Sequence, residues 1–300
     1  MFNDLISKNQ LFDSHCHLHF NNYDKDRDEV LNESVRSEIG TVIDVGVNFE
    51  ESKKALKHAR KYKEVFATVG VHPETCIKGS DLYINNFERI VNEFEACKQL
   101  LVECKGTSSE ENRIIMIGET GLDFHWTKKG DLSPEEENES KQNQIELFRK
   151  HVSFSMDYGL PLTIHSRNAI LDCIEVLRST FNIASYKGSK KGVFHSLTPE
   201  SGDTEEDFYN KVNQVLEVDF MIGLNGIITF KNAELLRSVF IKVLKERIKK
   251  SSQIGPLDFY NAGFVFETDG PWLSPQGKRG ERNEPANIKI IYDFVKNIIS

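Results

Sequence analysis

Apolar and polar positions along this chain alternate on two length scales. Short apolar runs rich in β-branched residues are separated by longer amphipathic stretches with many charged residues. Each run has the length of a strand, and each stretch can hold a helix that crosses over a sheet. The pattern predicts an α/β protein with a (β/α)8 TIM barrel, whose site forms at the C-terminal strand ends. The eight predicted strands are residues 11–15, 41–45, 65–69, 113–118, 161–165, 192–195, 218–223 and 263–268.

The clearest helix start is the segment Ser133-Pro134-Glu135-Glu136. Ser133 can cap the helix, Pro134 suits its first position, and Glu136 can complete a capping box. This helix is expected to span residues 134–158 and to end at Gly159. Charged crossover helices are expected at residues 50–63 and 234–250, and a further helix is expected to begin at Pro285.

Length and composition limit the class of protein. The chain has 300 residues, 39% of them hydrophobic. At about 150 residues per domain the chain would have two domains, but a single α/β barrel domain can also have this length. Because no change in composition marks a boundary, residues 1–300 are expected to form a single domain. No run is long enough to span a membrane, and the N-terminus lacks the pattern of a secretory signal.

The charge and the cysteines narrow the class further. Lys and Arg number 38 and Asp and Glu 46, a net charge of −8, which argues against passive coating of nucleic acid. This negative charge is still compatible with an enzyme that binds phosphate groups through bound metal cations. Five scattered cysteines without a CxxC pair fit a reducing compartment, so the cytoplasm is expected, with the nucleus left open. No P-loop, GxSxG or GxGxxG motif is present, and no nucleotide cofactor or obligate protein partner is expected.

Metal-ligating residue types gather at the predicted strand ends. His15 and His17 are two positions apart on one extended segment, so both can face one cavity. Any one of these histidines alone could be a core or surface residue, and an HxH pair is by itself a weak signal. The residues at the other strand ends are His72, Glu119, His165, His195 and Asp269. Five of the nine histidines of the chain lie at these ends, which favours a shared site.

These residue types suit hydrolysis of a phosphodiester. Two divalent cations about 3.5–4 Å apart can activate water and stabilise charge on phosphoryl oxygens. A bridging carboxylate is then required, and Glu119 has the reach for it. Asp269 can bind a metal or take the proton of the attacking water. Neutral imidazoles would leave the cations with a net positive charge, which favours an anionic substrate.

Several segments together resemble the TatD-type metal-dependent deoxyribonucleases of the amidohydrolase-like superfamily. DSHCHL, GVHPE, IGETGLDF, PLTIHSR, FHSL, ETDGPWL and RNEPAN occur in that family's order, over about residues 11–287. The chain departs from the family at His19, where Asp or a similar residue is usual, and in Gly270-Pro271-Trp272-Leu273, where a small residue or Ser commonly precedes Pro-Tyr-Leu. Neither departure removes a proposed ligand.

The resemblance implies roles for the strand-end residues. His15 and His17 would bind a first metal, His165 and His195 a second, and Glu119 would bridge the two. Asp269 would bind metal and act as the catalytic base, and His72 would contact the substrate phosphate. The implied cofactors are two divalent ions, with Mg²⁺ or Mn²⁺ as the working metal and Zn²⁺ as a further option. The implied activity is hydrolysis of DNA by a two-metal hydroxide mechanism, as a 3′-to-5′ exonuclease in DNA repair or DNA fragmentation.

Alternatives stay open at the level of sequence. Arg282 is expected to contact DNA phosphates beside the metals, although a solvated loop followed by a helix start explains that segment as well. Trp126 and Trp272 follow strand ends and could stack on an unpaired base or simply pack. The same barrel could instead hydrolyse a small ester, lactone or amide, or serve as a scaffold without activity.

Overall fold

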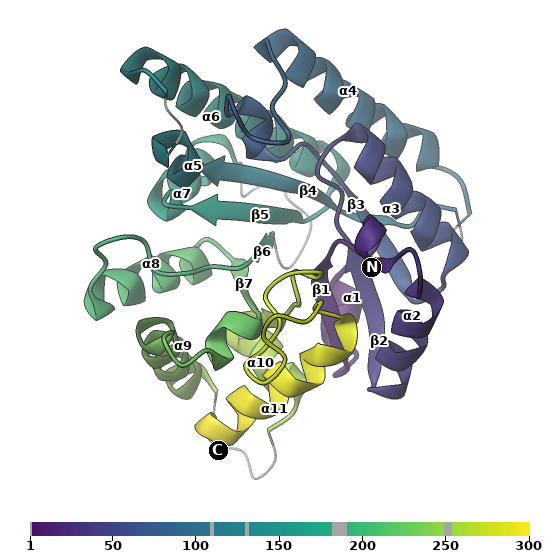
Figure 1. Ribbon diagram of the computed structural model, residues 1–300, viewed down its shortest axis with the longest axis vertical. Helices are drawn as coiled ribbons and strands as arrows, with labels where there is room; N and C mark the ends of the chain where they lie inside the picture. Colours follow the sequence, from purple (N-terminus) through teal and green to yellow (C-terminus); the bar gives the residue numbers. More distant parts are fainter. Residues whose placement is uncertain (1, 109–110, 130–131, 182–190, 249–253) are drawn as a thin grey trace.

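The computed structural model describes residues 2–108, 111–129, 132–181, 191–248 and 254–300. Eight parallel strands follow one another in chain order around a barrel, as the alternating pattern predicted (Figure 1). Every residue of most strands is buried, because helices cover the outer face and side chains fill the interior. The strands are β1 (Leu11–Cys16), β2 (Ile39–Asp44), β3 (Val65–Val69), β4 (Ile114–Asp123), β5 (Leu162–Arg167), β6 (Gly192–Phe194), β7 (Phe220–Leu224) and β8 (Phe264–Phe266).

Helices surround the barrel, with their apolar sides on the strands. In α11, for example, the buried residues Ile288, Ile291, Tyr292 and Val295 recur at helical spacing, and this side faces β1 and β8. No helix in the described ranges is long and apolar enough to cross a membrane. The helices are α1 (Phe2–Ser7), α2 (Arg27–Arg36), α3 (Phe49–Lys61), α4 (Phe87–Cys104), α5 (Phe124–Lys129), α6 (Pro134–Tyr158), α7 (Ile170–Thr180), α8 (Glu205–Glu217), α9 (Glu234–Arg247), α10 (Pro256–Ala262) and α11 (Ile288–Ile299).

The start of α6 agrees with its sequence signature. The Ser133 hydroxyl accepts a hydrogen bond from the backbone N–H of Glu136, and the Glu136 carboxylate accepts one from the backbone N–H of Ser133. The helix ends at Gly159, whose φ of 64° is left-handed. A short 3₁₀ turn (Pro285–Asn287) precedes α11, so the helix expected at Pro285 begins three residues later.

The barrel closes between β8 and β1, beyond the end of β8. The backbone N–H of Asp269 donates to the carbonyl oxygen of His15 at 2.8 Å, and that of His17 donates to the carbonyl oxygen of Gly270 at 2.8 Å. A parallel bridge joins Cys16 to Gly270. The seam of the barrel therefore consists of the same backbone that carries three of the predicted site residues.

Candidate metal centre

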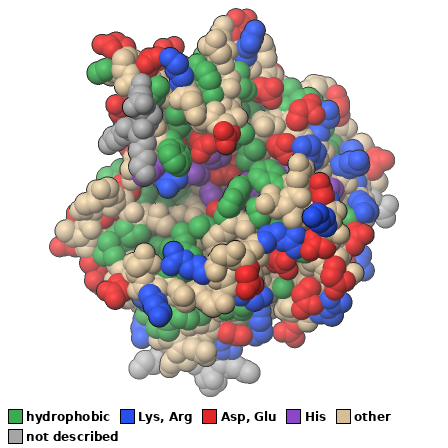
Figure 2. Space-filling view, viewed as in Figure 1, with side chains coloured by type: hydrophobic (Ala, Val, Ile, Leu, Met, Phe, Trp, Pro, Cys, Tyr) green, Lys and Arg blue, Asp and Glu red, His purple; other side chains and the backbone are tan. Residues whose placement is uncertain are grey.

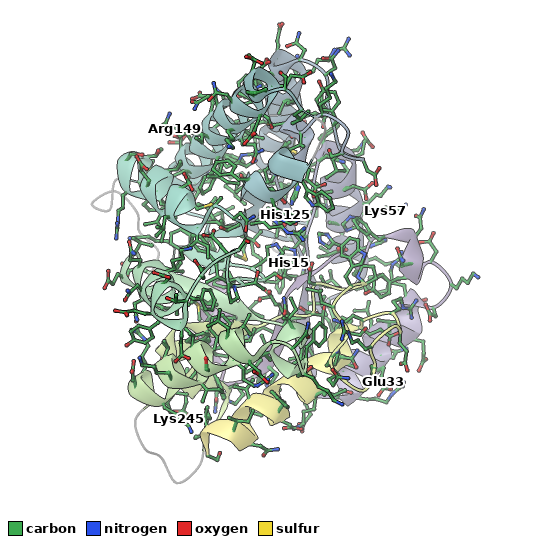
Figure 3. All side chains as sticks on the ribbon, turned by 60° about the vertical axis from the view of Figure 1, so that its left-hand side comes forward. His15, Glu33, Lys57, His125, Arg149 and Lys245 are labelled. Atoms are coloured by element: carbon green, nitrogen blue, oxygen red, sulfur yellow. The ribbon has the colours of Figure 1, made fainter. Side chains whose placement is uncertain are left out.

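All six predicted metal ligands lie together at the C-terminal end of the barrel. They come from both sides of the seam and from the far strands: His15 and His17 at the end of β1, Glu119 within β4, His165 within β5, His195 after β6, and Asp269 after β8. Figure 2 shows imidazole groups at the base of a hollow near the middle of this face. Figure 3 shows His15 deep inside the molecule, whereas Arg149 and Lys245 lie on outer helices.

Glu119 is the centre of the cluster. Its Oε2 lies 3.4 Å from Nε2 of His15 and 3.8 Å from Nε2 of His17. Its Oε1 lies 3.2 Å from Nδ1 of His165 and 2.8 Å from Nε2 of His195. Burial opposes the charge of this carboxylate, but the surrounding imidazoles outweigh burial and hold its pKa well below the usual range. The two oxygens thus face two separate pairs of nitrogen ligands.

The backbone of β4 can place Glu119 here because glycines flank it. Gly121 has a φ of 134°, and a Cβ atom there would lie 2.0 Å from the carbonyl oxygen of His165 on β5. Gly118 has a φ of 133°, and its Cβ would lie 2.4 Å from the carbonyl oxygen of Thr163. Side chains at these two positions would therefore separate β4 from β5.

The first pair, His15 and His17, presents two nitrogen atoms to one point. Nδ1 of His17 donates to the carbonyl oxygen of Val45 at 2.7 Å, so in the neutral ring Nε2 carries a lone pair. That Nε2 lies 3.4 Å from Nε2 of His15, which is fully buried. Burial lowers the pKa of His17 to about 4 and that of His15 well below its ordinary value. Both rings are therefore neutral near pH 7, as metal ligands must be.

The second pair, His165 and His195, is oriented by neighbouring groups. Nε2 of His165 donates to Oδ2 of Asp123 at 3.0 Å, which leaves Nδ1 directed at Glu119. A carboxylate that holds the far nitrogen of a histidine is typical of metal ligands. Nδ1 of His195 is buried and has no hydrogen-bond partner in the described part of the chain. Its ring stacks on His15, with centroids 3.9 Å apart.

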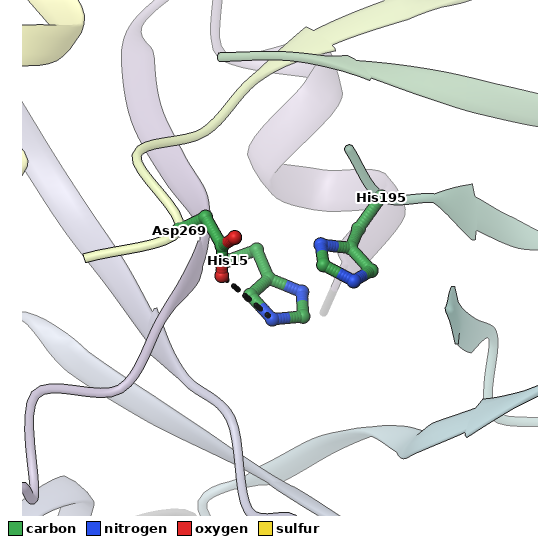
Figure 4. A group of neighbouring side chains, drawn as sticks. All are labelled: His15, His195 and Asp269. Carbon is green, nitrogen blue, oxygen red and sulfur yellow. Dashed lines mark ion pairs between the residues drawn. The ribbon is translucent and has the colours of Figure 1, made fainter. Parts of the chain in front are cut away.

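Asp269 adds a carboxylate to the first pair of histidines, from the other side of the seam. Its Oδ1 lies 3.8 Å from Nε2 of His15 and 3.7 Å from Nε2 of His17. Figure 4 shows this carboxylate against the ring of His15, with His195 on the other side of that ring. Its side chain is 14% exposed, against 4% for Glu119. Burial, together with the charge of Glu119, raises the pKa of Asp269 to about 6.

This donor set fits divalent cations. Three groups of three residues each bring ligand atoms within 4.8 Å of one another: His15, His195 and Asp269; His15, His17 and Glu119; and His72, Glu119 and His165. The facing lone pairs of His15 and His17 and the orphaned nitrogen of His195 are polar atoms that a cation would satisfy. Imidazole nitrogens with carboxylate oxygens suit Zn²⁺ and Mn²⁺, and the carboxylates suit Mg²⁺.

His72, predicted to contact substrate, lies inside the same cluster. Its Nδ1 accepts from the backbone N–H of Glu74 at 3.2 Å, so the neutral ring carries its proton on Nε2. That Nε2 lies 3.2 Å from Oε1 of Glu119. The neutral side chain is thus a hydrogen-bond donor directed at the centre of the site, which is the property that a phosphate contact requires.

Arg282 lies in a different environment from the one expected. Its guanidinium donates to both carboxylate oxygens of Asp26 at 2.8 Å and contacts Glu284 at 2.6 Å. It also lies over the ring of Tyr23, 4.7 Å from the centroid. These contacts join the loop before α11 to the start of α2. The phosphate contact proposed for Arg282 stays a prediction, and its charge is already balanced here.

Two buried carboxylates support the ligands and were not singled out from the sequence. Asp13 accepts from Thr268, through the backbone N–H at 2.9 Å and the hydroxyl at 2.5 Å, and so joins β1 to the segment after β8. Glu267 accepts from the backbone N–H of Ser196 at 2.6 Å, next to His195. Both residues lie two positions before a ligand, in DSHCHL and ETDGPWL, and this alternation is the signal that could have identified them.

His19, the departure from the family pattern noted above, is buried and pairs with two carboxylates. Its Nδ1 lies 2.6 Å from Oδ1 of Asp44, and its Nε2 lies 3.0 Å from Oε2 of Glu51. Burial opposes protonation, but the two carboxylates outweigh it and raise the pKa of His19 to about 9. The charged ring therefore pairs with Asp44 and Glu51 beside His17 instead of entering the ligand set.

A cavity of about 220 Å³ opens beside the ligands. Its walls include His165, His195 and Asp269, together with Arg167, Ile227 and Leu273. Trp272 packs its ring edge-on against His17, with the ring centroids 5.4 Å apart, and 51% of the residue is exposed. Trp126 is also exposed, and the Arg167 guanidinium lies over it.

Comparison with known proteins identifies the family of this chain. A family model described as "TatD related DNase" matches residues 12–300. The chain belongs to the TatD-related DNase family. An uncharacterized metal-dependent hydrolase of Buchnera aphidicola is 30% identical over 291 residues, which cover 95% of this chain and 90% of the relative. This TatD-family protein is accordingly a metal-dependent hydrolase.

More distant similarity is found both in sequence and in structure. A protein of Homo sapiens named deoxyribonuclease TATDN3 is 23% identical to this TatD-family chain, over 96% of the chain and 87% of the human protein. The crystal structure of YJJV, a TatD homologue from Escherichia coli, superposes with a TM-score of 0.70 at 21% identity, covering 96% of this chain and 90% of that structure. The eight-stranded barrel is therefore common to this TatD-family protein and its structural neighbours.

Proposed function

We propose that this protein is a metal-dependent deoxyribonuclease that hydrolyses phosphodiester bonds of DNA from the 3′ end, in DNA repair or DNA fragmentation. The observation that carries the proposal is Glu119, because each of its oxygens faces a separate pair of imidazoles. That geometry suits a carboxylate bridging two cations, and paired cations are typical of enzymes that cleave phosphodiesters. The family description and the printed name of the human relative support DNA as the substrate.

The proposed hydrolysis assigns a different role to each group of residues in the site. Divalent cations held by the two pairs would neutralise charge on the phosphoryl oxygens and lower the pKa of water. Asp269 is the more exposed carboxylate of the site and would accept the proton of the attacking water. His72, with its proton on Nε2, would donate a hydrogen bond to a phosphoryl oxygen beside Glu119. The buried walls exclude bulk water and strengthen these interactions.

The working metal is proposed to be Mg²⁺ or Mn²⁺, two ions per chain. Imidazole-rich pairs bind Zn²⁺ tightly, so purified protein is expected to retain some zinc, whereas carboxylates and cellular supply favour Mg²⁺ and Mn²⁺. A cytoplasmic location is proposed from the cysteines, since all five are free and buried.

A labelled-DNA assay tests the proposed activity. Single-stranded and nicked DNA carrying a 5′ label are incubated with the protein and Mg²⁺ or Mn²⁺, and products are separated on a gel. A ladder that shortens from the 3′ end is expected, and EDTA should abolish it. Glu119→Ala and Asp269→Ala should each lower the rate by at least about 100-fold, because loss of residues that merely orient ligands already costs about 10–100-fold.

The control is Glu50→Ala, which removes an exposed carboxylate on α3. It should cleave DNA at the wild-type rate. Unchanged activity in Glu119→Ala would contradict the bridging role. If wild-type protein cleaves a panel of small esters, lactones or amides and leaves DNA intact, the site is that of a small-molecule hydrolase.

A further inference from the structure

Arg167 is a positively charged residue beside the proposed metal ligands. It is the last residue of β5, two positions after His165, so both side chains lie on the same side of that strand. Arg167 is exposed, and its guanidinium lies 5.3 Å from the centroid of the Trp126 ring. Among the residues that the structure describes, the arginines that form ion pairs with carboxylates are Arg27, Arg36 and Arg282, and Arg167 is not one of them. The stack on Trp126 holds a planar donor group at the mouth of the site.

The cavity beside Arg167 connects it to the ligands. Its volume of about 220 Å³ lies below the roughly 300–1,000 Å³ of typical drug-size ligand sites, so one nucleoside-sized group suits it better than a stretch of duplex. Ile227 and Leu273 provide apolar wall against which a sugar or base can pack, and His165, His195 and Asp269 form the side where bond cleavage is proposed. A strand that places its scissile phosphate at the ligands would therefore direct its adjacent nucleoside toward Arg167.

Charge makes Arg167 more suitable than Arg282 as a phosphate contact. The protein carries a net charge of −8, and the carboxylates of the site repel a second phosphate unless a cation lies nearby. Arg282 is neutralised by Asp26 and Glu284. Arg167 keeps its donors for a ligand, and a guanidinium matches the geometry of two phosphate oxygens.

We infer that Arg167 binds the phosphate adjacent to the scissile phosphodiester, with the nucleoside between the two phosphates held in the 220 Å³ cavity. This inference rests on the proposed nuclease function and names the part of the strand that the site grips. It predicts that the protein distinguishes short substrates by whether they carry a second phosphate one nucleoside away from the cleaved bond.

Dinucleotides test the assignment kinetically. The substrates are thymidylyl-thymidine with one internal phosphate, and the same molecule with an added 5′-phosphate or an added 3′-phosphate. For wild-type protein in Mg²⁺, one of the two additions should lower KM by about 10-fold or more, the size expected for a charge-assisted hydrogen bond. Arg167→Met should lose that preference, so that its KM values for the three dinucleotides become similar. Arg167→Lys should retain part of it.

Arg149→Met is the matched control, since it removes the same charge from the outer surface of α6 (Figure 3). It should keep the full preference. If Arg167→Met also keeps it, or loses activity equally on all three dinucleotides, Arg167 does not bind the second phosphate.

A binding measurement separates this inference from the proposed function. Thymidine 3′,5′-bisphosphate is titrated into the protein in Mg²⁺ while tryptophan fluorescence, to which Trp126 contributes, is followed. Binding about 10-fold weaker in Arg167→Met than in wild type and Arg149→Met supports the assignment, and equal affinity overturns it. Failure of wild type to cleave any DNA would refute the nuclease proposal, and this titration would still decide the role of Arg167.

Discussion

His151 shows how a single buried group links stability to pH. It lies in α6, where its Nδ1 donates to the carbonyl oxygen of Leu147 and its Nε2 accepts from the backbone N–H of Val71. Burial lowers its pKa to about 4. The unfolded chain takes up this proton below about pH 6.5 and the folded chain only below about pH 4. The folded state should therefore lose stability as the pH falls between these values.

At pH 5 the loss from His151 should be about 2 kcal/mol relative to pH 7. Urea unfolding followed by circular dichroism at both pH values measures it. Other histidines also titrate, so the informative quantity is the difference from His151→Gln, which should lose about 2 kcal/mol less between pH 7 and pH 5. Equal losses in the two proteins would mean that His151 is protonated in the folded state.

The convergence of the six proposed metal ligands could be predicted from the sequence, because all of them lie near strand ends. Each predicted ligand lies at or shortly after the end of a predicted strand, and the structure brings all six together. The partners of Arg282 could not be found in the same way, because Asp26 lies 256 positions away and no periodicity links the two. Asp123 is part of a quoted motif, but its contact with His165 depends on the register of β4 against β5.

At the scale of elements, β4 is the strand whose sequence is most constrained. Gly121→Ala would place a Cβ against the carbonyl oxygen of His165, in a backbone conformation that non-glycine residues rarely adopt. We expect the free energy of unfolding to fall by about 2 kcal/mol or more, and hydrolysis to fall with it because Glu119 moves. Denaturant unfolding and the labelled-DNA assay measure the two effects.

Gly159→Ala provides the comparison for this strand variant. Gly159 also has a positive φ, but nothing lies within 4 Å of the position of its added Cβ. Its substitution should cost about 1 kcal/mol and leave activity unchanged. Similar losses of activity in both variants would show that the close contact between β4 and β5 does not determine the position of Glu119.

The positions of the strands were predictable, but their ends were less so. The third strand was predicted at its observed bounds, whereas β4 runs on to Asp123, five residues beyond its predicted end. The predicted strand ends at Gly118, and glycine in a strand interior usually weakens it. In this barrel Gly118 and Gly121 permit close packing on β5 and so extend the strand. At β8 the ladder stops at Phe266, and the seam is completed by the following residues.

For the whole molecule, bound metal should contribute measurable stability. The ligands come from five different strand regions, so the unfolded chain cannot present them together. A cation at about 100 times its Kd should add about 2.7 kcal/mol, which raises the Tm by about 4 °C for a chain of this size. Thermal unfolding of EDTA-treated protein with and without added Mn²⁺ measures the shift. Glu119→Ala should lose most of it, and an undiminished shift would place the cation elsewhere.

The seam between β8 and β1 has a consequence during synthesis. A nascent chain emerges from the ribosome with His15 and His17 first and Asp269 near the end, and the hydrogen bonds that position these residues form between the two. Until residues 269 and 270 are available, the first strand has no neighbour on its open edge and the cluster lacks its most exposed carboxylate. A polypeptide whose synthesis stops before Asp269 would thus lack part of the ligand cluster, so the complete cluster forms only after both edges of the seam have been synthesised.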